Sequence, residues 1–247
     1  MVKTLEVILM THPPSQDERT KVVQGQRNPF LVDGYEPDLY DVIRELVREG
    51  GPTDAVYTSD LKCSNIPARL VVDYLRSPKV LLIQQGRPIR YVETPFLRER
   101  ARGPLEGARY QVTDDGLTMV LEVGLVFPDG ETTKTFPEFQ TVDQYLYSLD
   151  DTNLGEDRDA IAERIATFRE RYLRPYERRG GKLLIMGHSH WINHARNLLL
   201  DGDVASRPYE PLGNLASIRL FKENAQQRYR ELNLSNTGNQ VNLVGVM

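Results

Sequence analysis

Short apolar runs alternate with amphipathic segments along most of the 247-residue chain, and this alternation limits the folds open to it. The runs at 5–10 (LEVILM), 54–59 (DAVYTS) and 182–187 (KLLIMG) are short and end at turn residues, as buried strands do. The segments 37–51 and 157–181 each place apolar residues on one helical face. Strands that alternate with helices predict an α/β fold: a three-layer sandwich with a mostly parallel central sheet and helices on both faces.

Weaker patterns complete this prediction. We expect helices at 64–75 and 189–200, and strands at 79–84, 89–94, 215–221 and 228–234. Residues 111–150 break the rhythm, because they hold eight acidic residues and one basic residue, Lys134. We therefore predict a single domain over residues 1–247, with an acidic insertion or cap at about 108–150 over one edge of the sheet.

Composition excludes several classes of protein. The net charge of −4 gives no basic excess, so a nucleic-acid partner is not expected. One cysteine permits neither an internal disulfide nor a multi-cysteine zinc site. The apolar runs fall far short of the roughly 20 residues that span a bilayer, and the N-terminus does not read as a signal peptide. We therefore expect a cytoplasmic protein without a membrane partner, and a homo-oligomer stays open.

Two of the four histidines follow predicted strands directly. His12 ends the first apolar run, and His188 follows the run at 182–187. Carboxyl ends of parallel strands meet at one edge of a sheet, where ligands bind, so we expect both imidazoles at one site. Glu99 lies after another predicted strand, within FLRERARGPLEG. Its carboxyl group can protonate a leaving oxygen if its surroundings raise its pKa.

Six motifs in order resemble those of the histidine phosphatase superfamily, which has the phosphoglycerate mutase-like fold. ILMTHPPS stands where the family has a strand ending in Arg-His-Gly, and LLIMGHSHWIN is similar to the strand ending in Ser-His-Gly. The other four similar segments are VVQGQRNPFLVDG, DAVYTSDLKCSNIPA, LRERARGPLEG and LGEDRDAIAERI. Each motif is loose, but six in the correct order are specific.

The resemblance implies phosphomonoester hydrolysis or phosphoryl transfer on a small phosphorylated or other anionic substrate, without a metal or organic cofactor. His12 would be the nucleophile that forms a phosphohistidine. His188 would stabilise charge on the phosphoryl oxygens, and Glu99 would protonate the leaving alcohol and then activate water. Residues near these motifs are candidates for substrate binding: Thr11, Ser15, Arg19, Lys62, Arg100, Arg102 and Ser189.

The chain departs from the family pattern at the phosphate-binding arginines. Thr11 and Cys63 occupy the two arginine positions, and Pro13 replaces the glycine after the nucleophile. A charge-assisted hydrogen bond contributes roughly 1.5–3 kcal/mol. Loss of both without replacement costs about 3–6 kcal/mol, or a factor of roughly 10² to 10⁴ in rate. A weak or specialised phosphatase fits this pattern, and so does a non-catalytic relative that binds an anionic ligand or a protein partner.

Two other functions compete with this interpretation. The spacing of His188, His190 and His194 is compatible with zinc ligation. The string from Cys63 to Arg69 has the Cys-x5-Arg form of cysteine-dependent phosphatases. For the cysteine at 63, the plainer alternative is a buried side chain at the family's arginine position.

Overall fold

A six-stranded sheet forms the centre of the computed structural model, in the order β3-β2-β7-β1-β8-β9. The structure describes residues 4–48, 51–121, 125–127, 129–149, 155–223 and 228–231. The four parallel strands are β1 (Leu5–Thr11), β2 (Ala55–Thr58), β3 (Arg90–Glu93) and β7 (Gly181–Gly187). Strand β8 (Ser217–Lys222) runs antiparallel to β1, and β9 (Arg230–Glu231) runs antiparallel to β8. The largely parallel sheet predicted from the sequence is confirmed.

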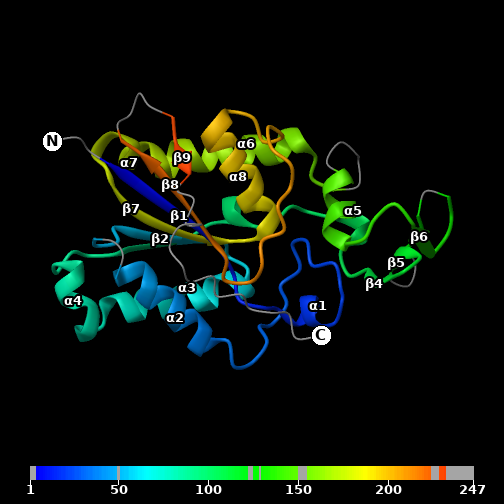
Figure 1. The fold of residues 1–247 in the computed structure, drawn as a ribbon, viewed down its shortest axis with the longest axis horizontal. Helices are drawn as coiled ribbons and strands as arrows, with labels where there is room; N and C mark the ends of the chain where they lie inside the picture. Colours follow the sequence, from blue (N-terminus) through cyan, green and yellow to red (C-terminus); the bar gives the residue numbers. More distant parts are fainter. Residues whose placement is uncertain are drawn as a thin grey trace.

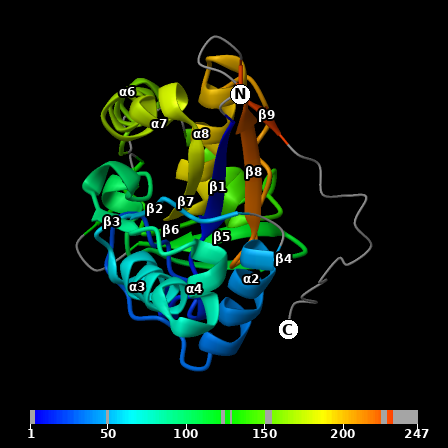
Figure 2. The same cartoon turned by 90° about the vertical axis from the view of Figure 1, so that its left-hand side faces the viewer.

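Helices cover both faces of this sheet (Figures 1 and 2). On one face lie α2 (Glu36–Arg48) and α3 (Lys62–Arg76), and on the other lie α6 (Arg158–Phe168), α7 (Arg174–Arg179) and α8 (Ser189–Asp201). A π-helical turn, Arg169–Leu173, joins α6 to α7. Alternation along β1 explains the two layers, because Val7 and Leu9 pack with α6–α8 whereas Ile8 and Met10 pack with α2 and α3. No described helix is long and apolar enough to cross a membrane.

One predicted strand is wrong, because residues 79–84 belong to helix α4 (Pro78–Gln84). Pro78 occupies the first helical position, where its missing N–H costs nothing. Val80 and Gln84, four residues apart, are buried on one side, whereas Leu82 is 91% exposed. The exposure of these residues therefore follows a helical period. The sequence does not show this period, because apolar residues occupy both the buried and the exposed positions of the run. Of the expected strand at 228–234, residues 232–234 lie outside the described part of the chain.

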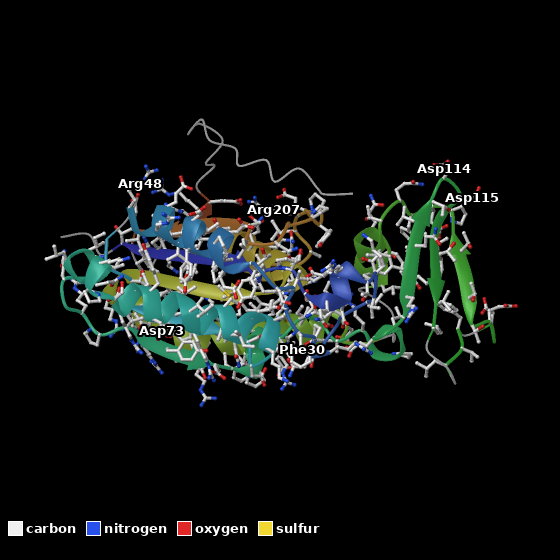
Figure 3. All side chains as sticks on the ribbon, turned by 90° about the horizontal axis from the view of Figure 1, so that it is seen from below. Phe30, Arg48, Asp73, Asp114, Asp115 and Arg207 are labelled. Carbon is white, nitrogen blue, oxygen red and sulfur yellow. The ribbon has the colours of Figure 1, made fainter. Side chains whose placement is uncertain are left out.

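The segment that interrupts the α/β pattern forms a sheet of its own. Strands β4 (Arg109–Thr113), β5 (Gly116–Val120) and β6 (Thr133–Phe136) pair antiparallel, and helix α5 (Val142–Ser148) follows them. They bury a separate apolar cluster that includes Met119, Phe127 and Tyr145. Figure 3 shows Asp114 and Asp115 at the outer end of this sheet, away from the α/β layers. The acidic residues of this turn thus lie remote from the central sheet.

Candidate active site

His12 and His188 extend from two neighbouring strands at the middle of the sheet. Strands β1 and β7 pair in register, with Thr11 opposite Gly187, and each histidine is the next residue. The His12 amide continues the ladder by donating to the Gly187 carbonyl at 3.1 Å. The two rings lie edge to face with centroids 4.9 Å apart. Backbone pairing therefore brings together two side chains that are 176 positions apart in the sequence.

The contacts of His12 fix its tautomer. Its Nδ1 lies 2.6 Å from the carbonyl oxygen of Pro13, and the side chain is only 6% exposed. A carbonyl oxygen can only accept a hydrogen bond, so Nδ1 carries the proton. In the uncharged form of the ring, the lone pair is therefore on Nε2. This is the arrangement that a nucleophilic or metal-ligating imidazole requires.

His188 is a buried, neutral imidazole. Its Nε2 lies 2.9 Å from the hydroxyl of Ser59, and its Nδ1 has no hydrogen-bond partner among the described residues. Burial, helped by the nearby His12, lowers the pKa of His188 to about 3. Because the Ser59 hydroxyl can donate or accept, Nδ1 can carry either a proton or a lone pair.

The Glu99 carboxylate is bound at the N-terminal end of α8. It accepts hydrogen bonds from the amides of His190 at 3.2 Å, Trp191 at 3.1 Å and Arg100 at 2.7 Å. Burial opposes ionisation, but the side-chain contact with His190, together with the electrostatic effects of His190, His188 and Arg102, holds the pKa of Glu99 well below its usual range. Without a ligand, Glu99 is therefore ionised, and the raised pKa on which an acid role depends is not found.

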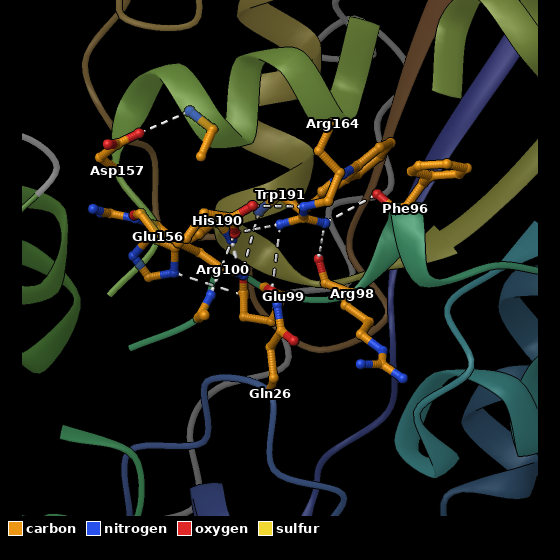
Figure 4. Close-up of polar contacts among 12 residues, drawn as sticks. Gln26, Phe96, Arg98, Glu99, Arg100, Glu156, Asp157, Arg164, His190 and Trp191 are labelled. Atoms are coloured by element: carbon orange, nitrogen blue, oxygen red, sulfur yellow. Dashed lines mark hydrogen bonds and ion pairs between the residues drawn. The ribbon is translucent and has the colours of Figure 1, made fainter. Parts of the chain in front are cut away.

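Arg164 on α6 organises the backbone around Glu99 (Figure 4). Its guanidinium donates to the carbonyl oxygens of Phe96 at 3.0 Å and Arg98 at 2.7 Å. It also forms two hydrogen bonds to the Glu156 carboxylate, at 2.7 and 2.6 Å. The loop that carries Glu99 is thus held from α6 and from α8 at the same time.

A cavity of about 130 Å³ opens beside these residues. It is smaller than the 300–1,000 Å³ typical of sites for drug-sized ligands, and so suits a small ligand. Five predicted residues line it: His12, Glu99, Arg102, His188 and Ser189. Of the described lysines and arginines, Arg102 alone reaches its wall, where it also donates to the Leu146 carbonyl at 2.9 Å. The insertion contributes Tyr110, Val142 and Leu146 to the same wall.

The other predicted substrate-binding residues do not line this cavity. Arg100 donates to the carbonyl oxygens of Leu149 and Glu156, which hold its guanidinium elsewhere. Ser15 caps the short helix α1 (Gln16–Arg19), and Arg19 is exposed at the end of that helix. Lys62 is exposed and lies over the ring of Phe30. Adjacency in a motif therefore did not predict which side chains face the histidines.

Thr11 and Cys63, which stand at the two positions where the family pattern has arginines, have small, buried side chains. The Thr11 hydroxyl donates to the Gly213 carbonyl oxygen at 2.6 Å. Cys63 is fully buried and accepts a hydrogen bond from the Gln24 amide at 3.3 Å. Arg102 is therefore the cation best placed to replace either arginine.

The structure contradicts the cysteine-phosphatase alternative. Burial, against a smaller opposing effect of the Gln24 hydrogen bond, raises the pKa of Cys63 to about 12, so the thiol is protonated at neutral pH. Arg69 is paired with Glu93 at 2.6 Å on the exposed side of α3. The protonated Cys63 thiol is therefore not a nucleophile, and the guanidinium of Arg69 is not directed at a phosphoryl group beside it.

The triple-histidine zinc site is wrong as well. His190 stacks on Tyr209, and His194 is buried with its Nδ1 3.4 Å from the Val204 carbonyl oxygen. Within the described ranges, no group of potential ligands close enough to share an ion contains His190 or His194. The i, i+4 spacing put these two histidines on one helical face, but His190 lines the cavity whereas His194 is fully buried and does not line it.

Three residues of the site had no assigned role in the sequence. Ser59 lies inside the motif TSDL and Gln24 inside VVQGQ, so position in a motif was an available signal for both. Arg164 follows Glu163 on a charged helix face, and nothing in that pattern distinguishes it from a solvated arginine. Its role depends on tertiary contacts alone.

The burial of His194 predicts acid sensitivity. Burial, with nearby His190, lowers its pKa to about 3, whereas an unfolded chain titrates near 6.5. Between these values the unfolded state binds a proton that the folded state does not, so the free energy of unfolding falls as the pH drops from about 6.5 towards 3. Urea denaturation of His194→Gln across this range should give a shallower decline than wild type. Equal pH dependence of the unfolding free energy in His194→Gln and wild type would contradict the lowered pKa of His194.

Solved structures with the same architecture are numerous, although no protein-family model and no curated protein sequence matches the chain. A protein described as mycobacterial hydrolase 1 superposes with a TM-score of 0.62 at 15% identity, covering 94% of this chain and 98% of that one. Phosphoglycerate mutase from Bacillus anthracis gives 0.59 at 15%, covering 94% and 93%. A mycobacterial glucosyl-3-phosphoglycerate phosphatase in complex with VO3 gives 0.57 at 16%, covering 93% and 97%. The chain therefore has the fold of the phosphoglycerate mutase-like histidine phosphatases.

Proposed function

We propose that the protein hydrolyses small phosphomonoesters through a phosphohistidine on His12. The observation that carries the proposal is the buried imidazole pair, in which the lone pair of His12 lies on Nε2 and the rings are 4.9 Å apart. Nε2 attacks phosphorus, the bond to the leaving oxygen breaks, and water later cleaves the phosphorus–nitrogen bond. A phosphatase of the same fold is known in complex with VO3, which supports an oxyanion as a ligand of this fold.

Charge stabilisation falls to His188 and Arg102. With Ser59 donating to Nε2 of His188, the Nδ1 proton points to an oxygen of the phosphoryl group. Arg102 lines the same cavity and supplies a full positive charge. One guanidinium where the family pattern has two predicts slow turnover or weak binding.

Glu99 serves as proton carrier in this mechanism. It is ionised in the free protein, but a phosphoryl dianion in the same cavity raises its pKa by like-charge repulsion. Substrate binding is then accompanied by proton uptake, and the proton passes to the leaving oxygen. The carboxylate that remains activates the water for the second step. Because the free carboxylate must gain a proton, turnover should increase on acidification from neutral pH.

The direct test is hydrolysis of p-nitrophenyl phosphate by the full chain. We expect slow release of phosphate that persists after treatment with a chelator and is faster at pH 5 than at pH 7.5. A rate that disappears on chelation and returns with added metal would contradict the histidine mechanism. No turnover at any pH with a broad panel of phosphomonoesters, by protein that retains its circular dichroism, would favour the alternative of a non-catalytic anion-binding protein.

A further inference from the structure

A second kind of ligand fits the imidazole pair, because a thiol faces it. His12, Cys63 and His188 each offer one ligand atom, and these atoms all lie within 4.8 Å of one another. All three side chains are buried. Within the described ranges, this is the only group of three or more histidine, cysteine or acidic side chains close enough to share a metal ion.

We propose that His12, Cys63 and His188 form a binding site for Zn²⁺, and that the bound ion blocks phosphoryl transfer. Two imidazoles and one thiolate make a nitrogen- and sulfur-rich set that suits zinc, whereas Mg²⁺ and Ca²⁺ prefer oxygen ligands. Three protein ligands leave the fourth tetrahedral position for water or an anion.

Each of the two imidazoles has one nitrogen that is available to bind the ion. The lone pair of His12 is on Nε2, because Nδ1 donates to the Pro13 carbonyl oxygen. Nδ1 of His188 is buried without a hydrogen-bond partner in the described structure, and it gains a lone pair when Nε2 donates to Ser59. The direction of the hydrogen bond between Ser59 and Nε2 therefore decides the state of Nδ1. When Ser59 donates, Nδ1 carries a proton for a phosphoryl oxygen, and when Ser59 accepts, Nδ1 carries a lone pair for a metal ion.

Cys63 supplies the third bond, because the zinc ion replaces the proton on its sulfur. The Sγ–Zn bond forms as the thiol releases its proton to solvent, and the Gln24 amide donates to the resulting thiolate. Tetrahedral zinc with bonds of about 2.0–2.3 Å holds its ligand atoms roughly 3.3–3.8 Å apart. Closure from the present arrangement thus requires about 1 Å of side-chain movement between the most distant pair of ligand atoms.

Metal and substrate compete for one lone pair. A zinc ion on Nε2 of His12 uses the electrons that would attack phosphorus, so the loaded protein cannot form a phosphohistidine. The blocking effect rests on the proposed function, whereas the binding of zinc does not. The two can therefore be tested separately.

Binding is measured without reference to turnover. The full chain, freed of metal with a chelator and then dialysed, is titrated with Zn²⁺ in competition with a chromophoric chelator and, separately, with Co²⁺. We expect one ion per chain and a thiolate-to-cobalt charge-transfer band that Cys63→Ser removes. Cys63→Ser and His188→Ala should each weaken zinc affinity by about tenfold or more. His194→Gln is the matched control, a buried histidine outside the group, and should bind zinc as wild type does.

The outcomes are distinct. The site would be overturned if the folded protein does not bind zinc stoichiometrically. It would also be overturned if zinc affinity is unchanged in all three folded variants, Cys63→Ser, Cys63→Ala and His188→Ala. If zinc binds through these residues but phosphatase activity is absent under all conditions, the proposed function fails and the site stands. If the enzyme is active, Zn²⁺ should inhibit it and Mg²⁺ should not, and a chelator should restore the rate. The activity of Cys63→Ser, compared with its own metal-free rate, should be less sensitive to zinc than that of wild type. Activity that zinc-loaded protein retains in full would refute the block.

Discussion

Replacing His12 by alanine should lower the turnover of p-nitrophenyl phosphate by between roughly 10⁴- and 10⁶-fold, the range seen when a covalent catalytic unit loses its central members. The substitution removes the Nε2 lone pair that attacks phosphorus in the proposed mechanism. The measurement is initial-rate kinetics at acid and neutral pH, with the folded state checked by circular dichroism.

Cys63→Ser is the control for this experiment. The thiol is protonated and is not the nucleophile, so this variant should keep measurable turnover. Rapid quenching of wild-type protein with substrate should also trap a phosphoenzyme that is labile in acid and stable in base, as expected of a phosphorus–nitrogen bond, and His12→Ala should form none. Equal rates for His12→Ala and wild type would end the proposal of a histidine nucleophile.

Cys63→Arg should increase affinity for vanadate and inorganic phosphate by roughly 10- to 100-fold. The Cys63 thiol lies within 4.8 Å of a ring nitrogen of both histidines, so a side chain at this position is directed at the imidazole pair. A guanidinium there adds charge-assisted hydrogen bonds of about 1.5–3 kcal/mol, and 1.4 kcal/mol is a tenfold change in affinity. Calorimetry with phosphate and inhibition by vanadate measure the change independently.

Cys63→Met separates charge from volume, because it extends the side chain without adding a donor. It should bind phosphate no more tightly than wild type. Thermal denaturation of both variants shows whether the larger side chains are accommodated in this fully buried position. A folded Cys63→Arg protein with the phosphate affinity of Cys63→Met would show that the guanidinium does not reach the ligand.

The elements that position the imidazole pair were predictable, because local patterns specify them. Strands β1 and β7 are continuous apolar runs bounded by turns, and the rule that ligands bind at the carboxyl ends of parallel strands then places His12 and His188 at one edge. Helix α4 was not predicted, because a short apolar run does not by itself distinguish a strand from a helix.

Electrostatics and side-chain direction were less accessible from sequence. The Glu99 carboxylate owes its low pKa, against the effect of burial, chiefly to the side chain of His190 on α8, which lies about 90 positions further along the chain. Arg100 and Arg102 are two residues apart in one motif, yet only Arg102 lines the cavity. Such differences depend on loop conformation and on partners such as Arg164, which no local pattern specifies.

The pairing of β1 with β7 has a consequence for how the site responds to thermal motion. Both strands are flanked on each side within the sheet, so their amides belong to the part of the fold that opens last. The spacing of the two imidazoles is therefore insulated from partial opening of the insertion and of the loops that carry Glu99 and Arg102. Subglobal fluctuations can admit or expel a ligand while the histidine pair itself stays assembled until the whole sheet melts.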